Sequence, residues 1–249
     1  MNFNLSKAFL FTIAGVAASA MATQSIPVKS VFFPAQGYDD NDALVQFVVD
    51  AELPNSCYIQ GLSHAKLDTE NKTIEVVQLA DRREDGICAN SDENLPQNAK
   101  LPIPFSSETS LRTLVAGDYS VEFLTQDKKA TKALHVDVAP STSVDSYSYA
   151  TITNIFAPAD VSASSDTFEI RITGTLNSSC AYLSKVEAIL VNDVIVVLPK
   201  VAQKNDICLP TNKSFYKVVK AKTPAPGRYL LHGRSQGSVA RNMLFSVTE

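Results

Sequence analysis

The stretch LNSSCAYL, residues 176–183, has a near copy in LPNSCYIQ, residues 53–60. Each phrase contains one of the four cysteines of the chain and follows a run in which apolar and polar residues alternate. Because further landmarks surround both phrases in the same order, we predict two copies of one domain of about 120 residues. Chance matching of short apolar phrases is the alternative, and it does not explain a shared order.

The other landmarks are a phenylalanine near a proline, a second cysteine and a Gly-x-Tyr phrase. They are Phe33, Cys57, Cys88 and Gly117–Tyr119 in the first half, and Phe156, Cys180, Cys208 and Gly227–Tyr229 in the second half. The phenylalanine precedes the first cysteine by 24 residues in both halves. The first half is longer after its first cysteine, and insertions of that kind fall in loops.

The local pattern is that of β-strands. In TFEIRITGTL, residues 167–176, every second residue is apolar, which predicts a strand with one buried and one wet face. The buried face would carry Phe168, Ile170, Ile172 and Leu176, matched in the first half by Val45, Phe47, Val49 and Leu53. About seven such segments per half, with no long helical pattern after the N-terminal segment, predict an all-β protein of antiparallel sandwiches.

The two Gly-x-Tyr phrases indicate a particular corner. The glycine can adopt the positive φ of a turn entering a strand, and the tyrosine can bury its ring while its hydroxyl bonds to backbone. In these phrases, together with LPxxC and a second cysteine, the chain resembles the immunoglobulin-like and fibronectin-type modules of exported bacterial proteins. The resemblance covers both halves and implies two tandem immunoglobulin-like antiparallel β-sandwich domains. The chain departs from true immunoglobulin domains because it has no Trp and its second cysteine precedes the Gly-x-Tyr strand.

The N-terminus is typical of an export signal. Lys7 precedes the apolar run AFLFTIAGVAASAMA, and small residues occupy the positions that a signal peptidase reads before Ala20 and Ala22. A membrane anchor is the alternative, but the run is short for a span and ends in small residues. We therefore predict a signal peptide over residues 1–22, a secreted or periplasmic protein, and no transmembrane segment after cleavage.

The junction between the predicted domains is VAPSTSVDSYSYA, residues 138–150, which is rich in Ser and Thr. This composition predicts one β-sandwich domain over residues 23–142 and a second over residues 143–249. The short linker predicts that the two sandwiches lie end to end.

In an oxidising compartment, an even number of cysteines usually forms disulfides. Four cysteines allow three pairings, and the repeat favours Cys57 with Cys88 and Cys180 with Cys208. A metal site is the rival interpretation, but no C-x-x-C is present and only His64 lies near a cysteine.

The sequence offers little catalytic chemistry. The three histidines are His64, His135 and His232, and the last two lie in strand-like segments, where we expect surface or edge-strand residues. Neither G-x-S-x-G nor H-E-x-x-H occurs, so we predict no enzyme, no catalytic residue and no cofactor. The acidic loop Asp39–Asp42 could attract calcium but lacks EF-hand spacing, and we predict no metal.

The two halves differ in charge. Residues 23–140 carry ten Lys and Arg against eighteen Asp and Glu, and residues 141–249 carry eleven against eight. The net charges of −8 and +3 indicate either attraction between the halves or an anionic partner for the second half. The predicted contact is the segment NKSFYKVVKAK, with Lys213, Lys217, Lys220 and Lys222 beside Phe215 and Tyr216. Solvated strand faces are the alternative for these lysines.

The leading hypothesis is an exported, non-enzymatic binding or structural protein that contacts an unknown protein or an anionic glycan or surface, and not nucleic acid. One alternative is a protease inhibitor that presents the rigid loop KLPIPF, residues 100–105. A second alternative is a hydrolase that uses paired acidic residues.

Overall fold

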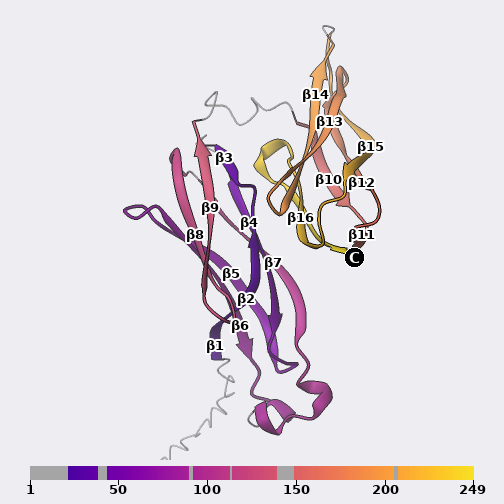
Figure 1. The fold of residues 1–249 in the computed structure, drawn as a ribbon. Coiled ribbons are helices and arrows are strands. Elements are labelled where there is room, and N and C mark those ends of the chain that lie inside the picture. Colours follow the sequence, from indigo (N-terminus) through magenta and orange to yellow (C-terminus); the bar gives the residue numbers. More distant parts are fainter. Residues whose placement is uncertain (1–21, 39–43, 90–91, 113, 139–148, 205–206) are drawn as a thin grey trace, which may run out of the picture.

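The computed structural model describes residues 22–38, 44–89, 92–112, 114–138, 149–204 and 207–249 of the chain (Figure 1). In these residues the regular structure is β-strand, joined by a few single-turn 3-10 helices. The prediction of an all-β fold is therefore confirmed. Residues 1–21 of the predicted signal, residues 139–148 of the predicted junction and the acidic loop 39–43 lie outside the described residues.

Residues 22–137 form two sheets. The larger sheet has the order β1-β6-β8-β9-β3, with β5 also paired to β6, and the smaller has the order β2-β4-β7. The strands are β1 (Ala22–Ile26), β2 (Val28–Phe32), β3 (Gln36–Tyr38), β4 (Leu44–Leu53), β5 (Tyr58–Asp68), β6 (Thr73–Arg82), β7 (Ile103–Arg112), β8 (Gly117–Leu124) and β9 (Lys129–Asp137). Between β6 and β7 the chain forms the short helices η1 (Gly86–Ala89), η2 (Asp92–Asn94) and η3 (Gln97–Ala99).

Residues 150–248 also form two sheets. The larger sheet has the order β11-β17-β16-β14-β13, and the smaller has the order β10-β12-β15. The strands are β10 (Thr151–Phe156), β11 (Asp160–Ser162), β12 (Thr167–Ser178), β13 (Ala181–Val191), β14 (Val194–Gln203), β15 (Pro210–Lys222), β16 (Gly227–Gly233) and β17 (Arg241–Thr248), with η5 (Gln236–Ser238) before β17.

Apart from β1, which pairs with β6, the strand orders of the two halves correspond. The sheet β2-β4-β7 matches β10-β12-β15, and β3-β9-β8-β6-β5 matches β11-β17-β16-β14-β13. Most neighbours are antiparallel, but β3–β9, β6–β8, β11–β17 and β14–β16 are parallel. The expectation of purely antiparallel sheets is wrong at these four pairs. Parallel neighbours arise because the chain crosses to another sheet between them, for example through β7 between β6 and β8.

Within each half the two sheets pack on a shared core. In the first half, Phe47 and Val49 of the small sheet meet Ile74, Val121 and other apolar residues of the large sheet. In the second half, Ile170 and Ile172 meet Ile195, Leu231 and Phe245 in the same way. These are the alternating apolar positions of β4 and β12, so the period-two pattern predicted both inner faces.

The two Gly-x-Tyr corners form as expected at the tyrosine. Tyr119 donates a hydrogen bond from its hydroxyl to the carbonyl oxygen of Val115 at 2.8 Å, and Tyr229 donates to that of Ala225 at 2.9 Å. The expectation for the glycine holds only in the first half. Gly117 has φ +143°, whereas Gly227 has no positive φ.

The halves pack side by side through sheet faces, so the end-to-end expectation is wrong. Phe32 and Val48, on the outer face of β2–β4, meet apolar residues on the outer face of β14–β16 in one buried cluster. The second-half members of this cluster are Val194, Val196 and Leu230. The outer face of β4 is apolar at Val48, and burying it against another apolar face is favourable.

Polar bonds surround this apolar contact. Lys132 pairs with Asp193 at 2.5 Å, and Arg228 pairs with Asp50 at 3.1 Å. The amide of Ala240 also donates to the side-chain oxygen of Gln46 at 2.8 Å. The first half supplies the cation of one pair, Lys132, and the second half supplies the cation of the other, Arg228. These pairs therefore do not depend on the excess positive charge of the second half.

Candidate functional site

The outer face of the sheet β10-β12-β15 is the candidate site. Directly opposite residues on paired strands point to the same side of a sheet. Because Phe168, Ile170 and Ile172 of β12 point into the core, the residues between them and their partners point outward. We call this surface the open face, and it consists of Asn154, Phe156, Glu169, Arg171, Thr173, Tyr216, Val218, Lys220 and Lys222.

The register divides the four predicted lysines between two sides of β15. Lys213 and Lys217 pair with Leu176 and Ile172, so they have the same orientation as the core residues Phe215 and Ala221. Lys220 pairs with Glu169, and Lys222 pairs with Thr167, so both belong to the open face. All four side chains reach solvent because β15 is an edge strand.

The open face therefore includes only part of the contact predicted on β15, and it also includes residues of β10 and β12. Phe215 packs against the core, whereas Tyr216 is 61% exposed on the open face. Phe156 and Arg171, which the sequence did not single out, join Tyr216, Lys220 and Lys222 there. Alternation along residues 213–222 could have predicted which lysines lie on which side of the strand. The open-face residues on β10 and β12 could not be predicted in this way, because they depend on strand pairing.

Two aromatic rings and a guanidinium form a row across the open face. Phe156 of β10 is 53% exposed and lies directly opposite Arg171 of β12. Arg171 lies opposite Val218 of β15, two residues from Tyr216. Standard strand spacing puts the Cα atoms of Phe156 and Tyr216 about 12 Å apart, with Arg171 between them.

Polar groups fill the rest of the row. The hydroxyls of Thr153 and Thr173 lie 3.1 Å apart, and the Asn154 amide donates to the Thr173 hydroxyl at 3.4 Å. Arg171 makes an exposed ion pair with Glu169 at 3.4 Å. In the described part of the chain, Lys220 and Lys222 have no carboxylate within ion-pair distance, so the open face carries an excess of cations.

The matching face of the first half is covered. Phe32 pairs with Val48 as Phe156 pairs with Arg171, which makes Phe32 the counterpart of Phe156 in the ladders. The sequence comparison had matched Phe33 with Phe156, which differs by one residue from the match in the ladders. Phe32 is 2% exposed because the second half covers it, and Phe156 is 53% exposed. One face is thus occupied by protein and its counterpart is open.

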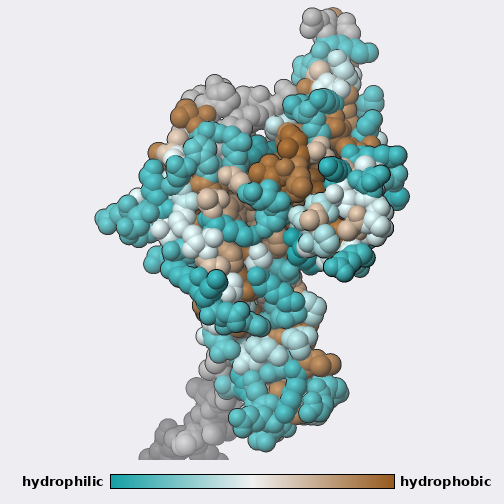
Figure 2. Space-filling view, viewed as in Figure 1, coloured by the Kyte–Doolittle hydropathy of each residue, from teal (hydrophilic) through white to brown (hydrophobic). Residues whose placement is uncertain are grey.

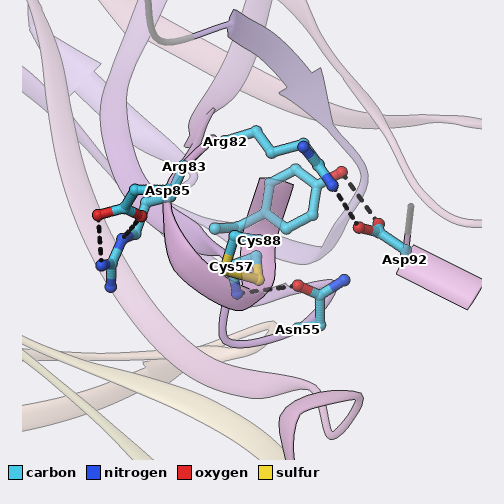
Figure 3. Close-up of a disulfide and its surroundings, with 8 residues drawn as sticks. Asn55, Cys57, Arg82, Arg83, Asp85, Cys88 and Asp92 are labelled. Carbon is cyan, nitrogen blue, oxygen red and sulfur yellow. Dashed lines mark hydrogen bonds and ion pairs between the residues drawn. A yellow bond between two sulfur atoms is a disulfide. The ribbon is translucent and has the colours of Figure 1, made fainter. Parts of the chain in front are cut away.

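The first disulfide lies at the end of the first half, where hydrogen bonds and apolar side chains surround it (Figure 3). Cys57 is joined to Cys88, and the Asn55 side chain accepts a hydrogen bond from the Cys57 amide at 2.9 Å. Asp92 of η2 receives hydrogen bonds from Arg82 and from the Tyr58 hydroxyl, at 3.1 and 3.3 Å. Leu95 and Ala99 complete a small apolar cluster around the sulfurs.

The second disulfide joins Cys180 to Cys208, so the prediction of disulfide bonds is confirmed and each bond lies within one half. The amide of Leu209 donates to the Ser179 hydroxyl at 3.0 Å, and the Ser179 amide donates to the Leu209 carbonyl at 3.0 Å. Cys88 is buried, but Cys208 is exposed. Among the described residues of the second half, none forms a counterpart of the segment η2–η3 that covers the first bridge.

The candidate inhibitor loop is only partly a loop. Ile103, Pro104 and Phe105 belong to β7 and pair with Leu53, Glu52 and Ala51. Lys100 donates from its side chain to the Glu93 carbonyl, which ties it to the loop around the disulfide. A strand that is hydrogen-bonded in this way is not a free loop for an active site, so the structure corrects that part of the hypothesis.

The histidines differ in environment. His64 is exposed on β5, and His135 is exposed on β9, as expected for His135. Asp118 and Asp137 bond to the two ring nitrogens of His135 at 2.6 and 3.0 Å and raise its pKa. His232 contradicts the expectation, because it is buried in β16, between β14 and β17. Burial, with a smaller contribution from nearby Arg234, lowers the pKa of His232 to about 4.

Two negative findings concern the described residues only. Within those residues, no group of three or more His, Cys, Asp or Glu side chains is arranged to hold a metal ion. Within the same ranges, no helix has both the length and the apolar character to cross a membrane.

Comparison of the chain with protein-family models, curated proteins and solved structures found no match. The function is therefore argued from the open face alone. That surface can stack flat ligands on Phe156 and Tyr216, exchange hydrogen bonds with hydroxyl groups through Thr173 and Asn154, and attract anions through its cations.

Proposed function

We propose that this chain is an exported, non-enzymatic binding protein that holds an anionic polysaccharide on its open face. The observation that carries the proposal is the combination of two exposed aromatic rings, three cationic side chains and a row of hydroxyl and amide groups on one face of one sheet. The cationic side chains are those of Arg171, Lys220 and Lys222.

The chemistry of a charged sugar chain fits this surface. The C–H faces of sugar rings stack on aromatic rings, and the distance from Phe156 to Tyr216 is close to the length of a disaccharide unit. Arg171 lies between the rings, where a carboxylate or sulfate of the same chain would meet a guanidinium. Exposed ion pairs contribute at most about 1 kcal/mol each, so affinity requires several contacts along an extended ligand.

An acidic protein is a weaker fit. Stable protein interfaces have an apolar, well-packed centre surrounded by a polar rim. On the open face the order is reversed, because the charged Arg171 lies between the apolar groups of Phe156 and Tyr216. The contact between the two halves illustrates the other arrangement, with Phe32 and Val48 at its centre and ion pairs around them.

We further propose that the halves arose by duplication of one immunoglobulin-like sandwich, exported with the N-terminal signal. The matching sheet orders support this proposal. So do irregularities in matching strands, since β2 and β10 each carry a register shift, as do β5 and β13. The two disulfides and the two tyrosine corners occur at corresponding places as well. On this account the domains are residues 23–142 and 143–249.

The test uses two variants with the same change in charge on the same strand. Lys220→Gln/Lys222→Gln removes cations from the open face, and Lys213→Gln/Lys217→Gln removes cations from the other side of β15. Binding to polygalacturonate, dextran sulfate and neutral dextran is measured by isothermal titration calorimetry at two salt concentrations.

We expect the unmodified chain to bind the charged polymers and not neutral dextran, with affinity that falls as salt rises. Lys220→Gln/Lys222→Gln should weaken binding several-fold, Tyr216→Ala should weaken it similarly, and Lys213→Gln/Lys217→Gln should leave it nearly unchanged. If the two double lysine variants lost the same affinity, net charge alone would explain the effect, and the proposed site would be refuted. Absence of binding to both charged polymers would refute the ligand class.

A further inference from the structure

Several large apolar side chains within a few residues of the two disulfides in sequence or strand pairing are exposed to solvent. Around Cys57–Cys88 they are Ile59, Ile87, Leu101 and Ile103, which we call the first disulfide end. Around Cys180–Cys208 they are Tyr182, Ile207 and Leu209, which we call the second disulfide end. Apolar side chains exposed together, as opposed to singly, mark interaction surfaces.

The two ends correspond in position. The residue before the second cysteine is an exposed isoleucine in both halves, Ile87 at 54% and Ile207 at 95%. The residue two places after the first cysteine is also exposed and apolar or aromatic in both, as Ile59 and Tyr182. Packing within the chain does not require these side chains, since water covers much of each one.

The two ends differ in charge. Residues 83–100 around the first bridge carry four carboxylates and two cations, a net charge of −2. Residues 200–213 around the second bridge carry three lysines and one aspartate, a net charge of +2. Each end therefore repels a copy of itself and attracts the other end, which disfavours symmetric contacts between like ends.

The two ends also lie far apart. Figure 1 shows η1–η3 at the bottom of the molecule and the strands that lead to Cys180 and Cys208 at the top. In the space-filling view, brown apolar side chains appear among teal polar ones at the lower end (Figure 2). A chain with complementary ends at its two extremities cannot join them to each other, but it can join them to other copies.

We propose that copies of this chain associate head to tail, with the first disulfide end of one copy on the second disulfide end of the next. Apolar contacts of Ile87 with the uncovered bridge region at Cys208 provide the attraction, and the opposite charges select the pairing. Such a heterologous contact does not close on itself, so it generates open chains. The inference is independent of the polysaccharide proposal, since no residue of the open face takes part.

The experiment compares the oxidised, purified chain with three variants by sedimentation velocity over a range of concentrations. Ile87→Ser inactivates the first end, Ile207→Ser inactivates the second end, and Val115→Ser removes an exposed apolar side chain near neither bridge as a matched control. All three positions are exposed, so the fold should survive, and circular dichroism checks this.

The unmodified chain and Val115→Ser should form a series of oligomers that grows with concentration and shrinks as salt rises. Each single variant should lower the association constant about tenfold, the usual cost of losing one apolar anchor. A mixture of Ile87→Ser and Ile207→Ser should yield a one-to-one complex that does not grow, because one functional joint remains between them.

Three results would overturn the proposal. One is a monomer at every concentration of the unmodified chain. Another is association that only one of Ile87→Ser and Ile207→Ser weakens, which would mean contacts between like ends. The last is association that neither isoleucine variant weakens. Because these outcomes involve no sugar, they leave the polysaccharide proposal to its own test.

Discussion

At the scale of residues, the two corner tyrosines make the same hydrogen bond in different surroundings. Each donates its hydroxyl proton to the carbonyl oxygen four residues earlier in the chain. Tyr119 is buried in the first core, whereas Tyr229 is half-buried and stacks on Phe245. Water can replace a lost hydrogen bond more easily at the more exposed site, so the two bonds should differ in their contribution to stability.

Tyr119→Phe should lower the free energy of unfolding by about 1 kcal/mol, the usual net contribution of one hydrogen bond. Tyr229→Phe should cost less, because solvent reaches the Ala225 carbonyl. Urea unfolding of both variants measures the difference. Equal losses, or a larger loss at Tyr229, would show that burial does not set the value of this bond.

His232 should make stability depend on pH. Its pKa is about 4 in the folded chain, mainly because of burial, and about 6.5 when the chain is unfolded. Between these values the unfolded chain binds the proton more readily, so stability is complete above pH 6.5 and falls as pH drops toward 4. The loss should total about 3 kcal/mol, since each pKa unit corresponds to about 1.4 kcal/mol.

The comparison for this prediction is His232→Gln, which keeps a neutral polar side chain beside Asn242. Carboxylates contribute to acid unfolding in both proteins, so the difference between their curves of unfolding free energy against pH isolates the histidine. The curves should converge as pH falls from 7 to 4. Parallel curves would mean that His232 does not titrate as a buried neutral group.

At the scale of elements, β15 shows what alternation alone can reveal. Lys213 and Lys217 share their side of the strand with Phe215 and Ala221, so they point toward the core side of an unpaired edge. Inward-pointing charges on an edge strand discourage pairing with another sheet. This is a different role from that of Lys220 and Lys222, which lie on the open face.

Lys217→Val should therefore promote aggregation without changing the fold. The substitution leaves an apolar, β-branched residue on a free edge next to Ile172. Light scattering during slow heating measures the onset of association. Lys217→Glu is the control, since either sign of charge protects an edge, and an aggregation onset shared by both variants would argue against edge protection.

The loop segment η2–η3 predicts an order of reduction for the disulfides. Leu95 and Ala99 of this part of the chain pack over Cys57–Cys88, whereas Cys208 is open to solvent. Exchange with a thiol requires access to a sulfur, so Cys180–Cys208 should be reduced first. Timed reduction with dithiothreitol, followed by alkylation and peptide mass spectrometry, measures both rates, and earlier loss of Cys57–Cys88 would contradict the account.

Some elements could be predicted from the sequence and others could not. The alternation of β4 and β12 predicted their inner faces correctly. It missed the burial of Val48, because a period-two pattern assigns that residue to solvent until a second surface covers it. It also missed β7, whose wet-faced residues in IPFSSETSLR resemble a loop and whose start had been taken as an inhibitor segment.

At the scale of the whole molecule, the two halves use matching surfaces differently. The outer face of β2-β4-β7 is a docking face within the chain, and the outer face of β10-β12-β15 is open. The sequence contained a hint of the first, in the adjacent apolar pairs Phe32–Phe33 and Val48–Val49, which favour burial on both sides of a strand. The partners across the interface depend on tertiary packing, so no local pattern names them.

The central claim is that the open face, and not another surface, receives an anionic polysaccharide. Backbone amide chemical shifts of the isotope-labelled chain, recorded during titration with short oligomers of galacturonic acid, test it most directly. The account predicts changes concentrated in residues 153–156, 169–175 and 214–222, with Arg171 and Tyr216 among the largest, and none in β2 or β4. Changes centred on the first half or on the disulfide ends, with β10, β12 and β15 undisturbed, would contradict it.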